Sequence, residues 1–168
     1  MERKLRIAQY GCGKMSVYTM RYAMEKGAEI VCAFGRSPHA IGRDIGEITG
    51  VGPTGVLVQD SRDAAAILKE KKPDACIITT ASLMLDLKRP FMDCAESGVN
   101  AITLCEEAFY PWNSAYKTTQ MLDELAKKNE SIEGGAIRRS SSISCNIGLW
   151  MTRFAWAWMK LPACSRIA

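Results

Sequence analysis

Short apolar runs alternate with helix-forming stretches over the first 130 residues, and this alternation limits the possible folds more than any other feature of the chain. The strand candidates lie at residues 5–10, 29–34, 55–58, 75–80 and 100–104. Helical patterns follow at residues 14–26, 62–71, 83–97 and 113–128, with a helix-plus-loop region at 38–52. Strands separated by helices at this spacing indicate βαβ units with right-handed crossovers. The sequence therefore predicts a doubly wound parallel sheet, an α/β fold of the Rossmann-like class.

Two pairs of capping residues mark expected helix starts. Asp60 or Ser61 can cap the helix at 62–71, because a short polar side chain there can accept from a free backbone N–H. Asn113 or Ser114 can begin the last helix in the same way.

A change of composition near residue 131 divides the chain into a domain at residues 1–130 and a tail at 131–168. The first part holds 17 Lys and Arg against 17 Asp and Glu. The tail holds five basic residues, one acid and three of the four Trp, so the net charge of +4 lies wholly within it. Because the first part is neutral, we do not expect nucleic acid as a partner.

The basic, Trp-rich tail is atypical, and three interpretations stay open. Residues 149–161 could form a helix that lies on a membrane surface or binds a partner protein. The same stretch could dock on the sheet as a native helix. The third interpretation, which we favour, is a frameshifted or prematurely ended gene whose tail stands in place of a substrate domain.

Other features of the composition indicate a cytoplasmic protein. No apolar run approaches the roughly 20 residues that span a bilayer, and the N-terminal segment is too short for a signal peptide. The seven cysteines form no C-x-x-C pair and no zinc spacing. We therefore expect reduced thiols and no metal site.

A glycine-rich turn lies where the first strand meets the first helix. It reads G-x-G-x-x-S over Gly11, Cys12, Gly13, Lys14, Met15 and Ser16. In a dinucleotide site the first glycine permits the tight turn and the second lets the backbone approach a pyrophosphate at the helix N-terminus. The alternative is an ordinary βα turn, but the strand–turn–helix context favours cofactor binding.

The end of the second strand bears on the choice between NAD and NADP. An NAD site usually places an acid there, whereas this chain has Arg36 and Ser37 and no acid until Asp44. Arg36 can pair with a 2′-phosphate and Ser37 can donate a hydrogen bond to it. Arg36 could instead be a solvated loop residue. The sequence favours NADPH, with NAD as the alternative.

The loops after the fourth and fifth strands lie at the carboxyl edge, where ligands bind in open α/β sheets. Thr79 and Thr80 suit a position beside a ribose or nicotinamide, and the alternative is a plain helix cap. Glu106 is expected at the nicotinamide end, and Glu107 is a candidate for an amine group of a substrate. Neighbouring carboxylates point in different directions, so we expect no shared-proton pair. The loop could also be a surface loop under aromatic side chains.

Two residue types with nucleophilic or basic potential receive no catalytic role. Cys105 has no identifiable base beside it. The single histidine, His39, lies in a loop beside Pro38 and is expected to face solvent. No catalytic residue is assigned from the sequence.

The run at residues 8–15 and the run Glu106-Glu107-Ala108-Phe109-Tyr110-Pro111 resemble the N-terminal domain of dihydrodipicolinate reductase-like proteins, relatives of 2,4-diaminopentanoate dehydrogenase. The resemblance covers about residues 3–130. It implies an NAD(P)-dependent oxidoreductase that acts at an imine or amine carbon of a small amino-acid or cyclic-imine substrate. It also implies a second domain for substrate contacts and dimerisation. The His-rich motif of authentic dihydrodipicolinate reductases has no match in this chain.

These observations leave two functional interpretations for the folded part. It can be the cofactor-binding half of an NAD(P)H-dependent oxidoreductase, or a non-catalytic dinucleotide-binding or interaction module. Hydride transfer needs an enclosed acceptor held against the nicotinamide. Without a substrate domain we expect cofactor binding and little turnover.

Overall fold

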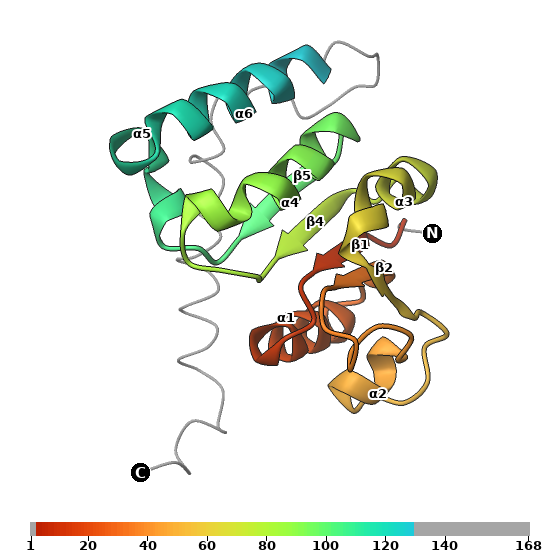
Figure 1. Ribbon diagram of the computed structural model, residues 1–168. Helices are drawn as coiled ribbons and strands as arrows, with labels where there is room; N and C mark the ends of the chain where they lie inside the picture. The colour runs from red at the N-terminus through yellow and green to blue at the C-terminus, as the bar shows by residue number, and fades with distance from the viewer. Residues whose placement is uncertain (1–2, 130–168) are drawn as a thin grey trace, which may run out of the picture.

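Five parallel strands form the centre of the computed structural model, which describes residues 3–129 (Figure 1). They are β1 (Arg6–Tyr10), β2 (Glu29–Gly35), β3 (Val58–Asp60), β4 (Ala75–Ile78) and β5 (Asn100–Thr103). Their order in the sheet is β3-β2-β1-β4-β5, and every neighbouring pair is parallel. The chain winds one way from β1 to β3 and the other way through β4 and β5, which confirms the predicted doubly wound sheet. The predicted tail lies outside the described residues.

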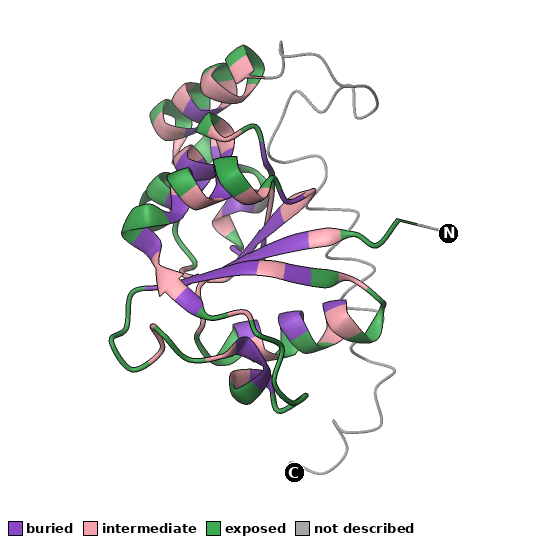
Figure 2. Ribbon diagram, turned by 90° about the vertical axis from the view of Figure 1, so that its right-hand side faces the viewer, coloured by how far each residue is buried: buried purple, intermediate pink, exposed green. Residues whose placement is uncertain are grey.

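Helices cover both faces of the sheet (Figure 2). One layer holds α1 (Lys14–Glu25) and α2 (Ile45–Thr49), and the other holds α3 (Ala64–Lys71), α4 (Met84–Glu96) and α6 (Tyr116–Asn129). The shorter elements are η1 (Ser61–Asp63), η2 (Glu107–Phe109) and α5 (Pro111–Ser114). Successive side chains of β1 point to opposite faces, since Ile7 packs with Met20 of α1 whereas Ala8 packs with Leu87 of α4. The sheet is therefore buried on both sides, as its continuous apolar strands predict.

The third strand lies later than its predicted position at residues 55–58. Residues 54–57 pair instead with the segment before α2, through an Ile45 N–H bond to Val56 O of 2.9 Å and a bridge between Asp44 and Leu57. The Asp44 carboxylate also accepts from the Thr54 hydroxyl at 2.8 Å and from the Gly55 N–H at 2.7 Å. These bonds, led by the Thr54 hydroxyl, lower the pKa of Asp44 to about 2. Pairing with β2 begins only at Val58.

Helix starts follow the prediction in one case and not in the other. Asp60 accepts from the Arg62 N–H at 2.9 Å and caps η1, which leads into α3. Neither Asn113 nor Ser114 caps α6, because both lie inside the separate short helix α5. An Ala115 N–H bond to Pro111 O closes α5, and α6 begins at Tyr116. In the described part of the chain, no helix combines the length and the apolar character that crossing a membrane requires.

The largest side chain with no exposed surface gives the first test of this fold. Phe34 of β2 is 0% exposed, and its ring centroid lies 5.4 Å from that of Tyr10. We expect Phe34→Ala to lower the free energy of unfolding by about 3–5 kcal/mol, a large share of the roughly 5–15 kcal/mol of a typical domain. Urea unfolding followed by circular dichroism measures this. Leu85→Ala is the control, because that side chain is 75% exposed, and an equal effect of the two substitutions would contradict the described core.

Candidate functional site

A cleft of about 200 Å³ opens at the carboxyl ends of β1, β2 and β4. This is the point where the strand order reverses, the usual ligand position in open α/β sheets. Its lining includes Gly11, Cys12 and Gly13 of the turn after β1, Arg36 and Ser37 after β2, Ser61 of η1, and Thr79 and Thr80 after β4. The structure thus brings together residues that lie in four separate stretches of sequence.

Gly11 occupies a position that other residues adopt only with strain. Its φ is +96°, in a region that side-chain-bearing residues rarely enter. A Cβ atom there would lie 2.8 Å from Thr80 Cγ2 and 3.1 Å from the Thr79 carbonyl oxygen. The Gly11 N–H donates to Phe34 O at 2.8 Å, which fixes the turn to the end of β2. The first glycine of the motif is therefore required by the fold itself.

A buried amide holds the same turn from inside the sheet. Gln9 is 0% exposed, although it lies in an apolar strand. Its Nε2 donates to Gly11 O at 3.0 Å and to Thr79 Oγ1 at 2.8 Å, and its Oε1 accepts from Thr19 Oγ1 at 3.1 Å. One side chain therefore joins the ends of β1 and β4 to α1. The sequence prediction missed this role, although a glutamine between apolar strand residues is itself an unusual signal.

Gly13 differs from Gly11, because the space beside it is open. It precedes α1, and no side chain caps the helix there. Apart from its two chain neighbours, no described residue has an atom within 4 Å of the position that a Gly13 Cβ would take. Ser16 is buried and donates to Gly13 O at 2.6 Å, so it serves the turn and not the cleft surface. The free N–H groups of a helix N-terminus favour an anion at such an opening.

Thr80 lines the cleft and has a hydroxyl group without a hydrogen-bond partner in the described part of the chain. Its Oγ1 is buried and has no hydrogen-bond partner among residues 3–129. Thr79, in contrast, accepts from Gln9. Buried hydroxyl groups are almost always hydrogen-bonded in folded proteins, so Thr80 Oγ1 is an exception among residues 3–129.

Arg36 and Ser37 lie at the end of β2, on the exposed rim of the cleft. Arg36 has no ion pair with any described carboxylate, whereas Ser37 Oγ accepts from the His39 N–H at 3.3 Å. His39 itself is exposed, as the sequence predicts. Among residues 3–129, no acid lines the cleft.

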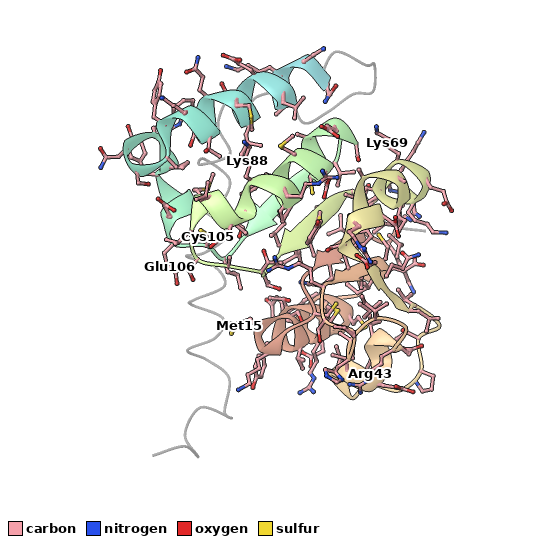
Figure 3. All side chains as sticks on the ribbon, viewed as in Figure 1. Met15, Arg43, Lys69, Lys88, Cys105 and Glu106 are labelled. Atoms are coloured by element: carbon pink, nitrogen blue, oxygen red, sulfur yellow. The ribbon has the colours of Figure 1, made fainter. Side chains whose placement is uncertain are left out.

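Other predicted site residues lie outside the lining of this cleft. Lys14 and Met15 are exposed on the first turn of α1, and Figure 3 places Met15 and Glu106 on the same edge of the molecule. Glu106 is exposed in the loop after β5. The Glu107 carboxylate accepts from the Met84 N–H at 2.6 Å and so caps α4. A hydrogen bond from Ser114 and this backbone bond hold the pKa of Glu107 below its usual value.

Neither cysteine near the site is a thiolate at neutral pH. Burial raises the pKa of Cys12 to about 11, and its Sγ lies 3.5 Å from Phe34 O. Burial also raises the pKa of Cys105, whose Sγ donates to Ser82 O at 3.0 Å. A thiol is a strong nucleophile only when ionised, so both groups contribute packing and hydrogen bonds.

A second cavity of about 450 Å³ adjoins the cleft, and we call it the basic cavity. Its charged lining consists of Arg36, Arg62 and Arg89 with one acid, Asp86. Sequence reasoning identified Arg36 alone, because Arg62 and Arg89 lie on η1 and α4 and meet Arg36 only in the folded sheet.

Gly11 combines a positive φ with close steric contacts, and comparing it with a glycine that has a positive φ alone tests the turn. We expect Gly11→Ala to lower the free energy of unfolding by at least about 2 kcal/mol, because alanine would combine an unfavourable φ with contact against Thr79 and Thr80. Gly27→Ala is the matched control, since its φ is +84° but, its chain neighbours aside, no atom of the described residues lies within 4 Å of its Cβ position. Its cost should be near 1 kcal/mol. If thermal or urea unfolding gave equal losses of the free energy of unfolding for the two variants, contact with Thr79 and Thr80 would not constrain the turn.

Comparison with known proteins gives relatives of the same kind as the sequence resemblance. No family model matches the chain. Over 92 residues it is 36% identical to 4-hydroxy-tetrahydrodipicolinate reductase of Methanosarcina barkeri, covering 54% of this chain and 34% of that protein. The reductase of the same name from Methanothermobacter thermautotrophicus is 35% identical over 102 residues, covering 58% and 36%. The chain spans about a third of the length of these curated relatives.

Two solved structures are also similar to this chain. An amine dehydrogenase from Mycobacterium smegmatis superposes with a TM-score of 0.72 at 39% identity, covering 76% of this chain and 38% of that one. A protein called RSP, solved in complex with beta-NADH, gives a TM-score of 0.51 at 15% identity, over 74% of this chain and 64% of that one. The second likeness shows the fold alone. The described part of this chain is therefore a Rossmann-like domain that is similar in sequence to about a third of these reductases and to part of the amine dehydrogenase.

Proposed function

We propose that residues 3–129 bind a nicotinamide dinucleotide and form the cofactor-binding part of an NAD(P)H-dependent oxidoreductase. The observation that carries this proposal is the open space at Gly13, at the N-terminus of α1 and at the point where the strand order reverses. Relatives named as reductases and an amine dehydrogenase support a reaction at an imine or amine carbon. A small amino acid or cyclic imine is the substrate class we propose.

The residues present fit such a cofactor. The turn at Gly11, Cys12 and Gly13 exposes backbone where a pyrophosphate can approach, and the first-turn residues Lys14, Met15 and Ser16 supply helix N–H groups. Thr80, whose hydroxyl has no hydrogen-bond partner among residues 3–129, lines the same cleft. When bound, the nicotinamide supplies the hydride chemistry, while the protein supplies binding, orientation and exclusion of water.

We place Thr79 and Thr80 beside a ribose of the cofactor and Glu106 at its nicotinamide end. The two threonines follow β4 and Glu106 follows β5, so all three lie at the carboxyl edge of the sheet. Glu107 is a weaker candidate for a substrate amine, because its carboxylate already accepts the Met84 N–H at the start of α4.

At the other end of the cofactor we propose a preference for NADPH over NADH. Arg36 carries a charge that no described carboxylate neutralises, and Ser37 lies beside it. A guanidinium group suits a phosphate ester, whereas an acid would suit the 2′-hydroxyl of NADH.

Titration of the chain with each reduced cofactor tests this preference. We expect saturable binding of NADPH that is tighter than binding of NADH. Arg36→Ala should weaken the binding of NADPH by about ten-fold or more, since a charged hydrogen bond contributes roughly 1.5–3 kcal/mol. It should change the affinity for NADH little. Arg43→Ala is the control, because Arg43 lies outside the cleft lining and pairs with Glu47. Absence of saturable binding for both cofactors would contradict the proposed function.

Gly13 provides a separate test, because its substitution should affect the ligand and not the fold. Gly13→Ala should change the free energy of unfolding by less than about 1 kcal/mol, since its φ of −88° is ordinary and its Cβ meets no atom of the described residues beyond its chain neighbours. Binding of NADPH should fall by about ten-fold or more, because the methyl group would occupy the approach of the pyrophosphate. Calorimetric titration measures the affinity. An unchanged dissociation constant in the folded variant would place the ligand elsewhere.

A further inference from the structure

The basic cavity is continuous with the cleft and differs from it in charge. Both are lined by Tyr10, Arg36, Ser61 and Thr80. A volume of about 450 Å³ is within the usual range for a small-molecule site. The charged groups of its described lining are three arginines and one acid, and Arg36 is the arginine among them without an ion pair to a described carboxylate.

Two of the three arginines are held from outside the cavity. Arg62 Nη2 lies 2.6 Å from Asp60 Oδ2, and Arg89 Nε lies 2.8 Å from Asp93 Oδ1. Neither aspartate belongs to the cavity lining. The Arg89 side chain is 67% exposed, and its pair with Asp93 involves Nε, so the remaining guanidinium N–H groups can serve a ligand.

The ion pair of Arg89 with Asp93 is linked to β1 through Tyr10. The Asp93 side chain is 1% exposed, and Tyr10 Oη donates to Asp93 Oδ2 at 2.9 Å. Burial raises the pKa of Tyr10, and hydrogen bonding to Asp93 raises it further, so the phenol stays a neutral donor. The Asp93 carboxylate therefore lies between the Tyr10 hydroxyl, which donates to one of its oxygens, and the Arg89 guanidinium, which forms an ion pair with the other.

We propose that the basic cavity takes the phosphorylated ribose of the cofactor, with Arg89 as a second arginine that reads the 2′-phosphate beside Arg36. This inference rests on the proposed function. Asp93 and Tyr10 are then positioning residues, which act through Arg89. A phosphate monoester carries between one and two negative charges at neutral pH, and recognition by two forked guanidinium groups, one after β2 and one on α4, suits it.

The single acid supports the opposite preference and makes the proposal testable. Asp86 lies one turn before Arg89 on α4 and also lines the cavity. If the cavity reads a free 2′-hydroxyl through Asp86, NADH binds more tightly than NADPH. The arginines and the acid therefore predict opposite cofactor preferences at one site.

The experiment titrates the full chain with four probes: NADPH, NADH, adenosine 2′,5′-bisphosphate and adenosine 5′-monophosphate. Arg89→Ala should raise the dissociation constants of NADPH and the bisphosphate by about ten-fold or more. The dissociation constants of NADH and the monophosphate should stay within about two-fold of their original values. Lys88→Ala is the matched control, because it is the neighbouring exposed residue of α4 and lies outside the cavity lining. Arg89→Lys should restore only part of the loss, since lysine lacks the planar fork.

Asp93→Asn and Tyr10→Phe test the positioning role. Both should reduce the preference for the 2′-phosphate, measured as the ratio of NADPH affinity to NADH affinity, in the same direction as Arg89→Ala. Because Arg89 is exposed, Arg89→Ala keeps the fold even if a change at buried Asp93 does not.

Two results would overturn the inference alone: NADPH binding that is unaffected in Arg89→Ala, or equal losses for NADPH and NADH. A preference for NADH that disappears in Asp86→Ala would also overturn it. If no probe binds the unmodified chain, the proposed function fails together with the inference.

Discussion

The hydrogen bonds of the Gln9 amide are the interaction on which the site depends. A fully buried polar side chain in an apolar strand is costly unless it is satisfied, and Gln9 is satisfied by Gly11 O, Thr79 Oγ1 and Thr19 Oγ1. These partners belong to the turn after β1, the loop after β4 and α1. The amide therefore joins two of the four stretches that line the cleft to α1, and Gly11 is the residue that lets the backbone turn after β1.

A second buried polar unit organises the other end of the site. Asp93 binds Tyr10 on one oxygen and pairs with Arg89 on the other, so a strand and a helix place an arginine beside Arg36. The glycine turn provides an uncharged opening for backbone contacts, whereas the basic cavity provides cations. A ligand with a central pyrophosphate and a distant phosphate would match both features.

Local sequence signals predicted the sheet, its five strands and the glycine turn, because these depend on periodicity and on turn chemistry. The third strand was predicted too early, since the Asp44 carboxylate and the antiparallel bridge draw residues 54–57 toward α2. The roles of Gln9 and Arg89 could not be predicted, because each depends on partners brought close only by the folded sheet. Glu107 had the chemistry of a substrate contact, but folding places its carboxylate on the Met84 N–H.

The most direct measurement of the account is a two-dimensional NMR titration of the isotopically labelled chain with NADPH. Dinucleotide binding at the turn predicts that the amide signals of residues 11–16, 36–37 and 79–80 shift together with a single dissociation constant. Signals of α2 and of the C-terminal half of α6, outside the lining of both cavities, should stay in place. Shifts confined to other elements, or no saturable shift at all, would contradict the assignment of this cleft as a dinucleotide site.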